Sequence, residues 1–102
     1  MDFEERINTS VREMIHIGYK PQAFITMRIM YGTVNAIKKL VNSQEIPKGF
    51  TTLWERNRLD LSMENIIQEH EWINLFTDED RKKAMKRLSD YGYNNQFREK
   101  TT

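Results

Sequence analysis

The chain of 102 residues contains no cysteine and has only four glycines, two prolines and two histidines. Without cysteine it can form no disulfide, no thiolate metal site and no thiol nucleophile. Lys and Arg number 16 against 15 Asp and Glu, so it lacks the basic surplus of a general polyanion binder. It has no run of 18 apolar residues, the minimum for a transmembrane helix. We expect one small domain, and we expect it to be cytoplasmic because its acidic N-terminus does not resemble a secretory signal.

Apolar residues recur three and four positions apart, which is the period of an amphipathic helix. The few glycines and prolines fall between such segments, where helices end or begin. We therefore expect an all-α fold, a compact orthogonal bundle of five to six short helices. The expected helices cover about 3–17, 21–31, 34–42, 50–57, 63–70 and 78–91. Residues 1–93 should form this single domain, and residues 94–102 a flexible polar C-terminal tail.

Two of these segments allow more specific predictions. Segment 21–31 is apolar on nearly every side, which is typical of a central helix covered by several neighbours. The last helix follows Thr77, with Asp80 three positions later, a pattern that resembles a capping box. Ser62 is expected to cap the helix of 63–70 in a similar way.

Five short motifs between Tyr31 and Tyr93 together carry a resemblance to a known type of domain. They are Gly32–Ala36, Gly49–Glu55, Arg58–Glu64, Leu75–Glu79 and Arg87–Tyr93. Together they resemble a short all-helical module of small uncharacterised bacterial proteins, which also forms the tails of larger ones. The resemblance implies a bacterial, all-helical domain and carries no activity, cofactor or site residue with it.

The residue types that would carry catalysis or bind a metal do not come together. We find no nucleophile–base pair and no Gly-rich phosphate loop. His16 and His70 are far apart, and position 67 is Ile, so no Glu-x-x-His unit is present. Most acids between Ser62 and Asp80 have simpler uses at helix starts, where the helix dipole favours them. We therefore expect no enzyme, no cofactor and no metal.

The basic residues of the last helix are expected to lie on its solvated side, opposite its apolar stripe. They are Lys82, Lys83, Lys86 and Arg87. Arg81 falls within the apolar face instead. Its stem either packs along that face with the head in water, or its guanidinium pairs with a buried acid such as Asp60.

Two functions remain open from the sequence. The first is a non-catalytic protein–protein interaction or regulatory module, with a protein partner or a second copy, in which an exposed aromatic would anchor the interface. The alternative is a nucleic-acid-binding or defence-associated accessory domain, although the acidic helix of 63–70 would repel phosphates. Its phosphate contacts would be Arg56, Arg58, Lys38, Lys39 and the 82–87 face. The candidate interaction residues are Arg56, Arg58, Trp72, Arg81 and Tyr93.

Overall fold

The computed structural model describes residues 1–93, so the expected tail of 94–102 lies outside the described residues. Within that range every regular element is helical, which confirms the prediction of an all-α bundle. The elements are α1 (Phe3–His16), α2 (Gln22–Tyr31), α3 (Thr33–Val41), α4 (Lys48–Glu55), the 3₁₀ turn η1 (Leu59–Leu61), α5 (Met63–Ile66), the 3₁₀ turn η2 (His70–Trp72) and α6 (Asp78–Asp90). None of the helices in this part of the chain is long and apolar enough to cross a membrane.

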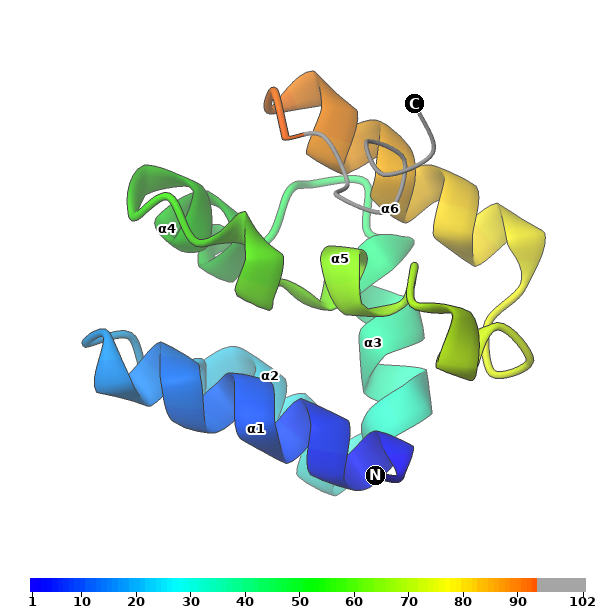
Figure 1. Cartoon of the computed structure of the whole chain (residues 1–102), viewed down its shortest axis with the longest axis horizontal. Helices are drawn as coiled ribbons and strands as arrows, with labels where there is room; N and C mark the ends of the chain where they lie inside the picture. The colour runs from blue at the N-terminus through cyan, green and yellow to red at the C-terminus, as the bar shows by residue number, and fades with distance from the viewer. Residues whose placement is uncertain (94–102) are drawn as a thin grey trace.

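The helices enclose one core of buried side chains. Figure 1 shows α1 and α2 together at one side of the molecule, α4 and α6 toward the other, and α3 running between the two sides. The short helix α5 lies in the middle and packs against α3, α6 and η1. Fully buried side chains come from α1, α3, α5 with its C-cap, and α6, and they include Ile7, Ile37, Ile66, Ile67 and Leu88.

Side-chain caps begin three of the helices. The carboxylate of Asp2 accepts the backbone N–H of Glu5 at 2.8 Å, where it satisfies a donor that the first turn of α1 leaves free. Ser62 caps α5, and the capping box at Thr77 is complete, because Asp80 accepts the Thr77 backbone N–H in return. The N-caps predicted at Ser62 and Thr77 are therefore confirmed.

Two predicted boundaries are wrong. α4 begins at Lys48, directly after Pro47, so the loop that precedes it is shorter than expected. The expected helix of 63–70 ends at Ile66, and Glu69 already has extended backbone with φ −66° and ψ 138°. The Glu69 carboxylate binds Arg6 of α1 at 2.7 Å, a contact between distant parts of the chain that the local pattern does not contain.

The prediction that segment 21–31 forms a central helix is also wrong. Of the residues of α2 only Phe24 is buried, whereas Ile29 is 81% exposed. The apolar side chains of α2 are distributed around the helix, and packing against α1 and α3 covers only one side of it. The central position belongs to α5, where Met63 and Ile66 are both buried.

Candidate functional site

Arg56 and Arg58, two of the predicted interaction residues, are engaged within the chain. Arg56 Nη1 donates to the backbone oxygen of Ile17 at 2.8 Å, which satisfies a carbonyl at the end of α1. Arg58 pairs with Asp60 at 3.1 Å and approaches Glu13 at 3.6 Å. Both arginines therefore join the turn after α4 to the C-terminal half of α1.

Trp72 is not the exposed aromatic that the sequence suggested. It is only 8% exposed, because η2 turns its indole inward against Phe3, with ring centroids 5.1 Å apart. Its Nε1 donates to the Glu69 carboxylate at 2.8 Å. Tyr93, the second candidate aromatic, is half-buried and packs against the core.

Arg81 adopts neither of its two expected arrangements fully. Its guanidinium donates to the backbone oxygens of Ile73 at 2.8 Å and Phe76 at 2.9 Å, and it pairs with Asp78 on the first turn of α6. The predicted pairing with Asp60 is therefore absent, since Asp60 binds Arg58. Arg81 holds the turn before α6 closed.

The basic side of α6 is solvated only in part. Lys82, Lys83 and Lys86 are exposed, and Lys86 pairs with Asp90 at 2.9 Å. The prediction for Arg87 is wrong, because this residue is 9% exposed and points into the protein.

Arg87 forms a buried ion pair with Glu64 of α5. Its Nη1 lies 2.8 Å from Glu64 Oε2, and Glu64 is 4% exposed. The guanidinium also donates to the backbone oxygen of Leu40, in the last turn of α3, at 3.1 Å and to that of Ser43, just after α3, at 2.9 Å. Burial raises the pKa of the Glu64 carboxyl, against the lowering effect of its own backbone N–H and of Arg87.

Asp80 is the second buried acid, and its surroundings act in the opposite direction. It accepts hydrogen bonds from the Asn42 side chain at 2.9 Å and the Thr77 backbone at 3.0 Å, and Lys38 lies 3.7 Å away. Burial raises the pKa of Asp80, but the hydrogen bonds from Asn42 and Thr77 and the charge of Lys38 outweigh it, so the pKa lies below its ordinary value. Both buried acids thus fasten α6 to other helices.

Metal-ligand side chains do not converge in this region. Among residues 1–93, no group of three or more His, Cys, Asp or Glu side chains could hold a metal ion. The ionisable residues described above instead tie one helix to another.

Within residues 1–93 the outer face of α2 is exposed and largely apolar. We define it by Ile25, Thr26, Ile29 and Met30, of which Ile29 is 81% and Met30 64% exposed. Arg28, the only charged residue of α2, turns away to α1, where its guanidinium binds Glu4 at 2.7 Å. The outer face of α2 is therefore apolar and uncharged, and Ile29 is the most exposed large apolar side chain of the described residues.

No family model, no curated protein and no solved structure matches this chain. The resemblance of residues 31–93 to a bacterial helical module stays a prediction.

Proposed function

We propose that this protein is a protein–protein interaction module that binds a second copy of itself through the outer face of α2. The observation that carries the proposal is the exposure of Ile29 and Met30 on a helix with no charged side chain facing solvent. Exposed apolar patches of this kind mark interaction sites in soluble proteins.

The lack of charge on this face indicates what it binds. A partner with an acidic or basic surface would find no complementary charge there. The same face of a second copy is equally apolar and uncharged, so a two-fold contact brings no like charges together. In a two-fold contact the outer face of α2 in one copy packs against the outer face of α2 in the other.

The size of the face sets the strength of the association. Burying one Ile or Met side chain stabilises by about 1.5–3 kcal/mol. Ile29 and Met30 from two copies together give a gain comparable with the cost of association, about 4–15 kcal/mol. A standard interface buries about 800 Å² of surface on each partner. A single helix of ten residues offers less surface than that. The dimer should therefore form in a concentration-dependent way.

The nucleic-acid alternative is less well supported. Half of its proposed cations already have acidic partners, among them Arg58, which binds Asp60, and Arg87, which binds Glu64. A phosphate contact by Arg58 or Arg87 would have to break its ion pair first.

Sedimentation equilibrium from about 1 µM to about 1 mM tests the proposal. We expect the average mass of the wild type to rise toward that of a dimer. The Ile29→Lys variant should stay monomeric, because two buried lysines would face each other in the contact. Ile73→Lys is the matched control, since Ile73 is 43% exposed and lies just after η2, and it should dimerise like the wild type.

Three outcomes would overturn the proposal. One is a wild type that stays monomeric at the highest concentration. Another is an Ile29→Lys variant that dimerises as the wild type does. The third is a wild type that binds neutral lipid vesicles through Ile29 without forming a dimer, since the face would then serve a membrane surface.

A further inference from the structure

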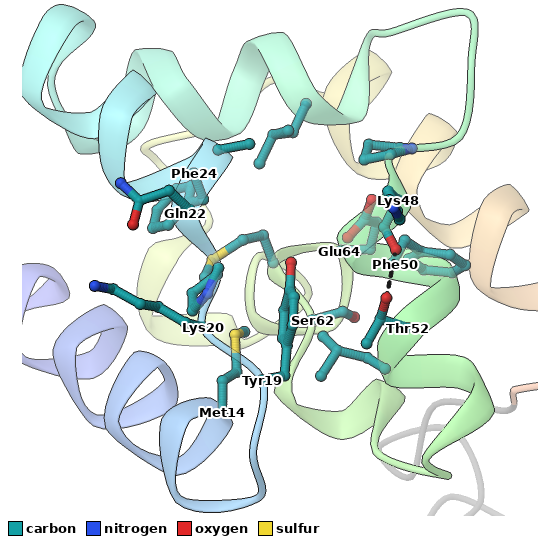
Figure 2. Close-up of a pocket in the computed structure, with 17 residues that line it drawn as sticks. Met14, Tyr19, Lys20, Gln22, Phe24, Lys48, Phe50, Thr52, Ser62 and Glu64 are labelled. Carbon is teal, nitrogen blue, oxygen red and sulfur yellow. Dashed lines mark hydrogen bonds between the residues drawn. The ribbon is translucent and has the colours of Figure 1, made fainter.

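A pocket opens beside the link between α1 and α2, with walls from α3, α4 and α5 (Figure 2). Its volume is about 370 Å³, within the range of about 300–1,000 Å³ of small-molecule sites. The lining is mostly apolar and includes Met14, Phe24, Leu40, Phe50, Leu53 and Met63. It is separate from the outer face of α2, because none of the four residues that define that face lines it.

Tyr19 brings a hydroxyl group into this apolar pocket. A Cβ atom at position 49 would lie 2.3 Å from the Tyr19 hydroxyl, so the glycine at that position leaves room for the ring. The Tyr19 hydroxyl is protonated at neutral pH, since its pKa is ordinarily 10.0 and burial raises it further. Within residues 1–93 this hydroxyl makes no hydrogen bond, so it can donate to an oxygen atom of a ligand.

The charges around the pocket favour an anion. Lys20 and Lys48 line it and are exposed, and Figure 2 shows them on opposite sides of the pocket. Neither forms an ion pair with another residue of the described chain, whereas Glu64, the acid in the lining, is already paired with Arg87. The rim therefore has a positive potential above an apolar interior.

We propose that this pocket binds a medium-chain carboxylate, with its alkyl chain among the apolar side chains and its carboxylate at the rim near Lys20 and Lys48. A cationic amphiphile would be repelled by the same two lysines. An uncharged one would gain the apolar contacts but no attraction at the rim. A carboxylate gains both and also offers an acceptor to Tyr19.

Titration of the full chain with decanoate, decanol and decylammonium, all below their micelle concentrations, tests the head group. We expect decanoate to bind most tightly and decylammonium most weakly. Within the carboxylates, affinity should rise about fourfold for each methylene from hexanoate to decanoate, because each one leaves water for the pocket. Equal affinity for the three head groups would overturn the proposal.

Methionine methyl groups report where the ligand binds. Met14 and Met63 line the pocket, Met30 lies on the outer face of α2, and Met85 lies on α6. In spectra of the protein labelled at its methionine methyls, decanoate should shift Met14 and Met63 and leave Met85 unchanged. Shifts confined to Met30, or no shift at all, would contradict the proposed site. Dimerisation affects Met30, so the failure of either proposal can be recognised separately.

Charge variants with a matched control complete the test. Replacing both lysines, as Lys20→Gln with Lys48→Gln, should lower decanoate affinity by up to about thirtyfold, the upper limit for two exposed ion pairs. The same change should leave decanol affinity as it is. Lys82→Gln with Lys83→Gln is the control, since these lysines are also exposed but lie on α6 away from the pocket.

A blocking variant tests the cavity itself. Ala23 is exposed and lines the pocket, so Ala23→Trp adds bulk at the rim without disturbing the core. It should abolish decanoate binding while the unfolding transition stays where it was. Unchanged binding in either Ala23→Trp or the double lysine variant would refute the assignment.

Discussion

The burial of α2 and of α6 is the reverse of what their compositions predict. α2 has a single charged residue, yet Phe24 is the only one of its residues that is buried, and Ile29 and Met30 face solvent. α6 is rich in charge, yet it buries Asp80 and Arg87 together with its apolar residues. The bundle exposes much of its most apolar helix and encloses part of a charged one.

The difference shows that partners, more than hydrophobicity, decide how far a helix is covered. Arg87 can be buried because Glu64 neutralises it and the end of α3 supplies carbonyl acceptors. The same helix is fixed at its start by Asp80, which binds Asn42 of α3. Within residues 1–93 α2 has no comparable set of partners on its outer face, and Ile29 and Met30 are exposed there.

Breaking the buried ion pair should have the largest effect on stability. Arg87→Met leaves Glu64 buried without its cation and removes the donors to the end of α3, so it should lower the free energy of unfolding by about 3–5 kcal/mol. Urea unfolding followed by tryptophan fluorescence measures this loss. Lys86→Met is the matched control, because its pair with Asp90 is exposed and worth about 0.3–0.5 kcal/mol.

A double variant separates charge from packing at this site. Glu64→Leu combined with Arg87→Met should recover most of the lost stability, because an apolar pair of similar volume removes the uncompensated charge. The part that is not recovered measures the hydrogen bonds to Leu40 and Ser43. If Arg87→Met lost no more stability than Lys86→Met, the comparison between α2 and α6 would fail.

The same substitution in two helices sharpens the contrast from the apolar side. Ile37 of α3 is fully buried, whereas Ile29 of α2 is 81% exposed. Ile37→Ala should cost about 2–5 kcal/mol, since it removes core packing and leaves a cavity. Ile29→Ala should change stability by less than about 0.5 kcal/mol. Thermal unfolding, measured at a protein concentration low enough for any dimer to dissociate, checks both values. Similar losses of stability in the two variants would mean that α2 is covered within the monomer.

The helices and their caps could be predicted from the sequence because their causes are local. The caps at Asp2, Ser62 and Thr77 act within three residues, and the glycines at 18 and 92 accept positive φ directly after α1 and α6. The existence of each helix therefore followed from spacing alone. The early end of α5 did not, and the contact that Glu69 then makes with Arg6 of α1 joins residues far apart in the sequence.

The buried ion pair was missed for a different reason. Charged residues are almost never buried unless paired, and a single sequence does not show that residues 64 and 87 meet. One signal was available, since Arg87 lies three residues after Ala84 and four before Tyr91, on the apolar stripe itself. The exposure of α2 had no such signal, because its apolar pattern is also that of a central helix.

The pH dependence of unfolding provides the smallest expected effect, and it compares the two buried acids. Burial raises the pKa of Glu64 above its ordinary value of 4.5, so the folded protein binds this proton more tightly than the unfolded chain. The resulting stability is complete below 4.5 and is lost as the pH rises through the raised pKa. For Asp80 burial also raises the pKa, but its hydrogen bonds prevail and hold it below 3.8. Its contribution is present above 3.8 and is lost as the pH falls through the lowered pKa.

Glu64→Gln and Asp80→Asn should therefore change the pH profile with opposite signs. The stability of Glu64→Gln relative to the wild type should increase as the pH rises from 4.5 toward neutrality, because only the wild type must give up the buried proton. The relative stability of Asp80→Asn should decrease as the pH rises toward 3.8, because only the wild type gains an ionised cap. Urea unfolding at a series of pH values measures both differences. If the stability difference between Glu64→Gln and the wild type did not change with pH, Arg87 would compensate the buried carboxylate completely. Enclosing charge between α5 and α6 would then have no cost in free energy.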